Sequence, residues 1–165
     1  MFDLDIRSLA AELLSISRER GITVATVESC TGGLVCGALT AISGSSSMVA
    51  GGLVTYSNEA KTALAGVPAE LILQHGAVSE PVARAMAEGG RERLSARLAV
   101  SITGVAGPDG GSEAKPVGLV HFACAGREQT LHREKRFGAL SRDEIRRLSV
   151  LEALDLLREA SLSLK

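Results

Sequence analysis

The sequence predicts an α/β fold: a single domain built on a mixed, mainly parallel sheet. Apolar, β-branched runs alternate along the chain with segments whose apolar residues recur at helical spacing. This alternation is typical of parallel strands joined by helices. Near the C-terminal end, two strand-like runs are separated only by a short turn, so they should pair antiparallel and make the sheet mixed. The length of 165 residues suits one domain with a full core.

Composition argues against several classes of protein. Apolar residues make up 45% of the chain and charged residues 22%, as in folded proteins rather than disordered ones. A formal net charge of −1, one Tyr and no Trp offer neither the basic surface nor the stacking aromatics of a nucleic-acid binder. No segment resembles a signal peptide or an apolar membrane span. We therefore expect no nucleic-acid partner and no membrane partner.

The spacing of cysteines and histidines argues against a metal site and against a disulfide framework. The cysteines are odd in number and form no CxxC pair, and no histidine has a partner at metal-ligand spacing. This usage fits the reducing cytoplasm, and the histidines are expected to be structural or solvated. The residues concerned are Cys30, Cys36, Cys124, His75, His121 and His132.

The first third of the chain is expected to form two helix–strand pairs. Residues 6–20 carry apolar side chains at helical spacing and stop at Gly21, a common helix end. The apolar run 22–27 predicts the first strand, and residues 34–40 predict a helix after a glycine pair. Residues 48–56 predict a second strand. The two glycines inside it indicate a bulge or a close approach by another backbone or a ligand.

Three helices and a third strand should follow. Residues 59–64 form a short helix behind a capping serine or asparagine, and residues 69–75 form another that glycine closes. A Ser-Glu-Pro start predicts a longer helix over about 80–94. Residues 98–103 predict the third strand, and the glycine-rich residues 104–116 predict a long loop.

The C-terminal part should form a hairpin and a final helix. Residues 117–125 and 130–137 predict two antiparallel strands that turn at Gly126. Ser141 and Glu144 match a capping box, which predicts the start of the last helix. Leucine and isoleucine then recur in steps of three on one face of that helix.

Polar residues stand at the ends of three predicted strands. Ser29 follows the first strand, Tyr56 ends the second and Thr103 ends the third. If these strands are parallel neighbours, the three residues share one crevice at the carboxyl edge of the sheet, where open α/β sheets bind ligands. Residues 28–33 form a strand-to-helix corner whose N–H groups would hold an anion or a developing oxyanion. The alternative is a purely structural glycine turn.

Lys61 is the candidate base for Ser29. It falls in the first turns of the helix after Tyr56, where the positive helix end and partial burial would both lower its pKa. A neutral lysine accepts a proton from a hydroxyl, and Tyr56 would relay that proton or orient the pair. The alternative is a solvated lysine on a surface helix.

Cys30 is a rival nucleophile at the same corner. A thiol at a helix N-terminus has a lowered pKa, yet cysteine is also among the residue types most often buried. Neighbouring residues leave such a corner in different directions, so only one of Ser29 and Cys30 faces the crevice. The residues by themselves do not decide which.

The glycine-rich residues 103–111 are a candidate phosphate loop. They lack the spacing of a P-loop and of a dinucleotide fingerprint, but their N–H groups would wrap a phosphate, with the charge of Lys115 close behind. Arg142 and Arg146, one turn apart at the start of the last helix, would face a fixed anion or solvent. The alternative for residues 103–111 is a mobile glycine-rich surface loop that binds no phosphate.

Five ordered motifs resemble the CinA C-terminal domain family, whose characterised members are nicotinamide-nucleotide amidases. The resemblance runs over about residues 5–160. The motifs are ESCTGG at 28–33, GLVTYSNEAK at 52–61, GAVSE at 76–80, TGVAGP at 103–108 and KPVG at 115–118.

The resemblance implies hydrolysis of the carboxamide of nicotinamide mononucleotide (NMN) to nicotinate mononucleotide and ammonia. It also implies a three-layer α/β/α domain, a homo-oligomer, and neither metal nor cofactor. Some members carry an additional N-terminal nucleotide-processing domain, and the chain is expected to be the stand-alone amidase form. A non-catalytic nucleotide-binding or regulatory module with the same fold is the alternative, because function depends on the site.

The resemblance further implies a Ser-Tyr-Lys site and so favours Ser29 over Cys30, with Tyr56 and Lys61 activating the serine. Backbone N–H groups from Thr31 to Gly33 would hold the oxyanion. The residues expected at the oxyanion or the rest of the substrate are Thr31, Gly32, Gly33, Thr103, Gly104, Gly107, Lys115 and Arg146.

The last helix departs from the family pattern. Relatives usually have Gly-Asp before its arginine, whereas Leu140 and Ser141 precede Arg142 here. This departure leaves the role of Arg142 open and does not affect the nucleophile.

Overall fold

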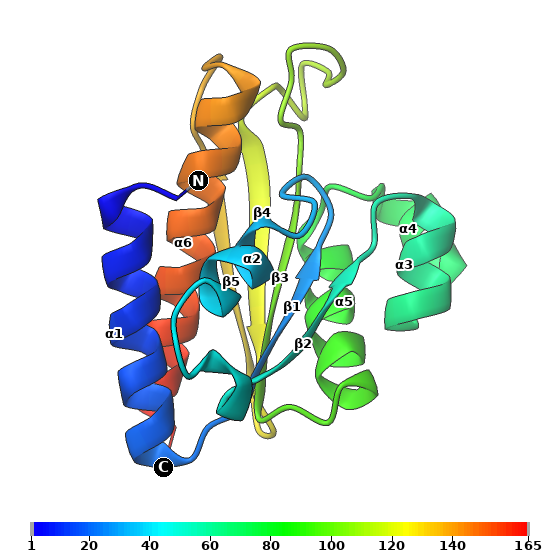
Figure 1. The fold of residues 1–165 in the computed structure, drawn as a ribbon. Helices are drawn as coiled ribbons and strands as arrows, with labels where there is room; N and C mark the ends of the chain where they lie inside the picture. Colours follow the sequence, from blue (N-terminus) through cyan, green and yellow to red (C-terminus); the bar gives the residue numbers. More distant parts are fainter. Residues whose placement is uncertain (1, 165) are drawn as a thin grey trace.

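A five-stranded sheet forms the centre of the molecule, between two helical layers (Figure 1). The computed structural model describes residues 2–164. The strands lie in the order β2-β1-β3-β4-β5. Strand β1 pairs in parallel with β2 and β3, and β3, β4 and β5 pair antiparallel. Their bounds are β1 Val24–Glu28, β2 Val49–Val54, β3 Leu98–Gly104, β4 Leu119–Ala125 and β5 Thr130–Arg136. The expected three-layer α/β fold with a mixed sheet is confirmed.

The helices divide between the two faces of the sheet. Helices α1, α2 and α6 cover one face, and α3, α4 and α5 cover the other (Figure 1). Their bounds are α1 Leu4–Arg20, α2 Leu34–Thr40, α3 Asn58–Ala65, α4 Ala69–His75, α5 Glu80–Arg93 and α6 Arg142–Ser163, with a short 3₁₀ turn at Ser45–Ser47. Within residues 2–164, no helix is both long and apolar enough to cross a lipid bilayer.

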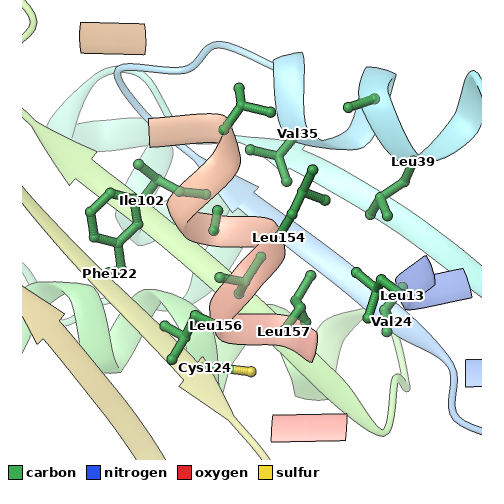
Figure 2. Packing of buried hydrophobic residues seen from close by; sticks show 14 of the residues in the cluster. Leu13, Val24, Val35, Leu39, Ile102, Phe122, Cys124, Leu154, Leu156 and Leu157 are labelled. Carbon is green, nitrogen blue, oxygen red and sulfur yellow. The ribbon is translucent and has the colours of Figure 1, made fainter. Parts of the chain in front are cut away.

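The larger core lies under α6. Its apolar face packs on β3 and β4, and side chains from α1 and α2 close the cluster at the side (Figure 2). Burying one such leucine or isoleucine stabilises a protein by about 1.5–3 kcal/mol. The side chains that Figure 2 labels are Leu13, Val24, Val35, Leu39, Ile102, Phe122, Cys124, Leu154, Leu156 and Leu157. This packing fixes the positions of β1 and β3 in the sheet, and with them the segments that follow their carboxyl ends.

Glycines in β2 produce the irregularity that the sequence predicts. The register shifts by one residue, since Val24 pairs with Val49 whereas Ala25 pairs with Gly51, whose φ is 151°. A side chain at Gly52 would place its Cβ 2.6 Å from the Thr26 hydroxyl oxygen. The bulge and the close approach are both present, and they allow β2 to run alongside β1 to the edge where Thr55 and Tyr56 leave the sheet.

Local signals located most helix ends, but the first strand extends further than expected. Ser141 Oγ accepts the Glu144 N–H at 3.2 Å, as the capping box predicts. The sequence placed the end of the first strand at Val27, whereas Glu28 still pairs with Val54 and Ile102 on either side. Glu28 therefore belongs to the sheet, and Ser29 is the first residue beyond it.

Candidate active site

The candidate site is a cavity at the carboxyl ends of the three parallel strands. Its volume is about 250 Å³. Because β1, β2 and β3 are parallel neighbours, the segments that leave them open onto the same edge, as the sequence analysis expected. The lining residues are Ser29, Cys30, Tyr56, Asn58, Lys61, Ala77, Val78, Thr103, Gly104, Ala106 and Arg142.

Ser29 and Lys61 meet inside this cavity. Ser29 is anchored by its own N–H, which donates to the Ile102 carbonyl at 2.9 Å and continues the β1–β3 ladder. Lys61 is one turn into α3, whose N-cap, Ser57, accepts the Ala60 N–H at 3.0 Å. These two anchors place Lys61 Nζ 3.2 Å from Ser29 Oγ, within hydrogen-bond reach.

Lys61 is buried, which is rare for a lysine. The residue is only 1% exposed. Burial disfavours the charged ammonium and lowers the pKa of Lys61 from its ordinary value of 10.5. The group is therefore shifted toward the neutral amine, the form that accepts a proton.

Two backbone carbonyls orient the amine. Lys61 Nζ donates to the Thr55 carbonyl at 2.9 Å and lies 3.4 Å from the Tyr56 carbonyl, in addition to its contact with Ser29. A neutral amine has two N–H donors and one lone pair. A neutral Lys61 amine that directs both donors at these carbonyls would turn its lone pair toward the Ser29 hydroxyl.

Tyr56 approaches the pair through its backbone and not through its hydroxyl. The residue is 61% exposed, and its hydroxyl accepts from Arg142 Nη2 at 3.2 Å. Arg142 Nη1 also donates to the Gly107 carbonyl at 2.9 Å. Among residues 2–164, the Tyr56 hydroxyl has no hydrogen bond to Ser29 or Lys61. Tyr56 and Arg142 thus form a polar rim on the cavity.

Cys30 belongs to the core cluster, although it also lines the cavity. It is buried in the cluster under α6, and burial raises the pKa of its thiol to about 12. A thiol with that pKa carries almost no thiolate at neutral pH. The structure therefore disfavours Cys30 as a nucleophile and leaves Ser29 beside the lysine.

A buried side chain of the protein fills the helix start behind Ser29. The Glu28 carboxylate accepts the N–H groups of Gly33 at 3.0 Å, Val35 at 3.1 Å and Cys36 at 2.8 Å. The Gly32 N–H donates to the Ser29 carbonyl at 3.0 Å. The N–H groups of Gly32 and Gly33, which the sequence analysis expected at an oxyanion, are therefore engaged within the protein.

The N–H groups just before these are available. Within residues 2–164, the N–H groups of Cys30 and Thr31 have no backbone or side-chain oxygen of another residue as acceptor. Both directly follow Ser29 in the chain. Cys30 also lines the cavity, whereas Thr31 is fully buried and, like Gly32 and Gly33, does not line it, so the Cys30 N–H is the donor that this corner offers to an oxygen bound beside the serine.

Other residues expected at the substrate lie in or around the cavity. Thr103 and Gly104 line it, and Thr103 Oγ1 donates to the Ala77 carbonyl at 2.8 Å. Lys115 Nζ donates to the His75 carbonyl at 2.6 Å, at the end of α4. Gly107 contributes its carbonyl to Arg142.

Arg146 supports the serine corner from outside the cavity. Its guanidinium donates to the carbonyls of Cys30 at 3.2 Å and Thr31 at 3.3 Å. Neither Arg146 nor Lys115 lines the cavity formed by the described residues. The cation at the rim is Arg142, one helical turn before Arg146.

Two histidines form a pair that their separation in the sequence concealed. His121 Nδ1 and His132 Nε2 are 3.0 Å apart across β4 and β5. Burial is the main cause that lowers the pKa of both, and the nearby His132 lowers the pKa of His121 further. The part of the chain that the structure describes contains no cluster of three or more His, Cys, Asp or Glu side chains suited to a metal ion.

The sequence analysis missed part of the cavity wall. Asn58, Ala77 and Val78 line the cavity, although none was a candidate. Asn58 directly follows the Ser57 cap, which was a usable signal, since the first turn of α3 also carries Lys61. Ala77 and Val78 are apolar residues in a turn, and only the packing of α5 against β3 brings that turn to the cavity.

The comparisons with known proteins agree with the fold and its motifs. The model of the CinA C-terminal domain matches residues 6–161. A CinA-like protein of Synechococcus sp. (strain RCC307) is 54% identical over 158 residues, which is 95% of this chain and 38% of that protein. This chain therefore spans well under half of that relative.

Solved structures are similar over almost their whole length. The competence/damage inducible protein CihA from Agrobacterium tumefaciens is 47% identical, with a TM-score of 0.95 and coverage of 99% of both chains. The competence damage-inducible protein A from Klebsiella pneumoniae is 34% identical, with a TM-score of 0.92 and coverage of 97% of this chain and 99% of that one. On these matches, this chain belongs to the CinA C-terminal domain family.

Proposed function

We propose that this protein hydrolyses the carboxamide of nicotinamide mononucleotide to nicotinate mononucleotide and ammonia. The single observation that carries the proposal is the buried Lys61 amine, 3.2 Å from the Ser29 hydroxyl in a cavity at the sheet edge. A serine with a neutral lysine beside it is an arrangement that activates the hydroxyl without a histidine. The family resemblance supplies the substrate, and the geometry supplies the nucleophile and base.

Acyl transfer would proceed in two steps. The Lys61 amine takes the proton of Ser29 while Oγ attacks the carboxamide carbon, which gives a tetrahedral oxyanion. Lys61 then returns the proton to the departing nitrogen, ammonia leaves, and an ester to Ser29 remains. Water attacks this ester by the same route, and Ser29 regains its proton. The positive pyridinium ring of NMN makes the carbonyl carbon more electrophilic.

The Cys30 N–H is the proposed oxyanion donor, since Cys30 directly follows Ser29 and lines the cavity. In other serine hydrolases, the N–H of the residue after the nucleophile serves this purpose. Removing one such donor costs about 10²–10³-fold in rate. Arg146 steadies the corner by binding the carbonyls of Cys30 and Thr31 from the far side.

The polar rim would hold the rest of the nucleotide. The cavity of about 250 Å³ accommodates the pyridine ring, and ribose and phosphate would extend past the rim. Arg142 stands there with a guanidinium whose partners are a carbonyl and a phenol, both neutral. Arginine pairs with phosphate through charge-assisted bonds, so we propose Arg142 as the phosphate ligand.

Ammonia release from NMN tests the function. Purified protein should release one ammonia per NMN and form nicotinate mononucleotide, measured by a coupled ammonia assay and by chromatography. Nicotinamide riboside, which lacks the phosphate, should be a poorer substrate because it cannot engage Arg142. If the protein binds NMN but releases no ammonia, the non-catalytic nucleotide-binding module is the correct interpretation.

Replacing Cys30 with alanine should leave the reaction in place. The thiol packs in the core and its pKa is raised to about 12, so it contributes no nucleophile at neutral pH. We expect kcat within about threefold of wild type and a stability loss of order 1 kcal/mol from the small cavity. Steady-state kinetics and urea unfolding measure the two effects. A loss of ammonia release in a folded Cys30→Ala variant would instead support a cysteine amidase.

Replacing Tyr56 with phenylalanine should affect binding more than chemistry. The Tyr56 carbonyl near Lys61 remains, whereas the hydroxyl that accepts from Arg142 is lost. We expect KM to rise several-fold, since one hydrogen bond to a charged group is worth about 1.5–3 kcal/mol at most, and kcat to stay near wild type. A fall in kcat of a hundredfold or more with unchanged KM would place the phenol in the proton transfer.

A further inference from the structure

Glu28 stands out because its carboxylate is fully buried and has no direct part in the proposed chemistry. The residue is 0% exposed. Three backbone N–H groups donate to its two oxygens, from Gly33 and Val35 to Oε2 and from Cys36 to Oε1. A carboxylate accepts and does not donate, so three inward-pointing N–H groups suit it. They are the groups that the start of a helix leaves without partners.

The backbone of Glu28 is tied to the rest of the site. Its peptide is the last of β1, and its carbonyl accepts the Thr55 N–H at 2.8 Å. The Thr55 carbonyl in turn accepts from Lys61 Nζ at 2.9 Å. Ser29 is the next residue along the chain. One residue therefore touches both the segment that carries the nucleophile and the segment that orients the base.

The side chain closes the corner between them. The turn from Ser29 to Gly33 begins at the Glu28 backbone and returns to the Glu28 carboxylate, so the backbone of Glu28 fixes the first end of the turn and its side chain fixes the second. Cys30 and Thr31 lie between those ends. Their N–H directions depend on the closure of this loop.

We propose that Glu28 is a positioning residue for acyl transfer: its carboxylate holds the Ser29–Gly33 turn so that the Ser29 hydroxyl faces Lys61 and the Cys30 N–H faces the reacting oxygen. This inference rests on the proposed amidase function. It also assigns the helix start to Glu28, so the positive end of α2 is occupied by the protein's own carboxylate and the substrate anion binds elsewhere.

A helix cap remote from the cavity provides the matched control. Asp3 caps α1 with the same chemistry, since its Oδ1 accepts the Ile6 N–H at 2.9 Å, and it also pairs with Arg147. Asp3 does not line the cavity. Asp3→Asn removes the carboxylate charge and its ion pair with Arg147 while keeping the capping Oδ1, as Glu28→Gln removes a charge while keeping one oxygen, but only the change at Glu28 should matter to the serine.

The experiment compares Glu28→Gln, Glu28→Asp and Asp3→Asn with wild type. Each folded variant is measured for thermal unfolding, for kcat and KM with NMN, and for the rate at which a fluorophosphonate labels Ser29, followed by intact mass. The labelling reports the nucleophile without the natural substrate. Glu28→Gln keeps the size but replaces one acceptor oxygen by a donor, and Glu28→Asp keeps the charge but withdraws it by one methylene.

We expect both Glu28 variants to lose about 10²-fold in kcat and in labelling rate, the cost of a small misplacement of reacting groups, with KM little changed. Asp3→Asn should lose only stability. Wild-type labelling and kcat in a folded Glu28→Gln or Glu28→Asp variant would overturn the inference. If the wild type is labelled at Ser29 but does not deamidate NMN, the proposed function fails, while the labelling rates still decide the role of Glu28.

Discussion

Ser29→Ala is expected to abolish ammonia release from NMN, by a factor of at least about 10³ in kcat, as removal of a catalytic nucleophile does in other serine hydrolases. The change deletes the hydroxyl that lies 3.2 Å from Lys61 Nζ. The rim of the cavity is untouched, so NMN should still bind. The measurement is a single-turnover assay for kcat together with calorimetry for the dissociation constant.

A buried serine that does not line the cavity is the control for this variant. Ser149 lies in α6 and its Oγ donates to the Ile145 carbonyl at 2.7 Å. Ser149→Ala should keep the wild-type rate. Undiminished deamidation in Ser29→Ala would eliminate the proposed acyl-enzyme route through Ser29, because the variant has no hydroxyl at that position to form the ester.

Lys61→Met is the second large expected effect, and it should act on activity and stability in opposite directions. Methionine fills a similar volume but has no amine, so kcat should fall by about 10²–10⁴-fold, the usual contribution of a general base. The amine is costly to bury, as its lowered pKa indicates. Replacing it should raise the free energy of unfolding at pH 7 by about 1 kcal/mol, as other relieved active sites do. Urea unfolding measures this gain.

The pH dependence of the gain follows from proton linkage. Burial lowers the pKa of Lys61 from 10.5. Between the lowered value and 10.5, the unfolded chain binds a proton that the native protein lacks, so wild-type stability rises with pH in that window. Lys61→Met lacks this dependence, so its advantage should shrink as the pH approaches 10.5. In the wild type, kcat/KM should also rise with pH through the lowered pKa, because the neutral amine is the base.

Two lysine variants sharpen the interpretation. Lys61→Arg keeps a cation that cannot lose its proton, so it should be inactive at every pH. Lys135→Met removes an exposed lysine of β5 that pairs with Glu152 in α6, and it should leave both kcat and its pH profile unchanged. A Lys61→Met variant that is active, or that is less stable than wild type at pH 7, would contradict the proposed buried base.

Signals between residues that are close in the sequence predicted most of the fold. The apolar spacing of residues 6–20, the glycines in β2 and the Ser141 cap act within one or two turns of chain, and each has the structure that those signals predict. The sequence predicted the ends of strands less accurately than the ends of helices. The β1 ladder continues through Glu28 because β2 and β3 lie on both sides of it, and one segment read alone cannot reveal its neighbours.

The candidate site was likewise predicted only in part from the sequence. Spacing and strand ends were sufficient to name Ser29, Tyr56 and Lys61 as candidates, since parallel strands must open at one edge, but they left Ser29 and Cys30 as alternative nucleophiles. Side-chain direction was beyond the sequence. Tyr56 reaches Arg142 with its hydroxyl and Lys61 only with its carbonyl, and Arg146 faces the serine corner rather than the cavity. Each of these outcomes depends on where α6 lies against the sheet.

The strand-to-helix corner at residues 28–33 shows which features the sequence determines and which depend on the tertiary structure. The sequence alone determines that a serine, two glycines and a helix start follow a buried strand, because such signals arise between neighbouring residues. Only the tertiary structure decides that the Glu28 carboxylate fills that helix start and that a lysine 32 positions away lies beside Ser29. The physical reason is that a buried polar group needs a partner, and the packing of distant elements determines which partner is within reach.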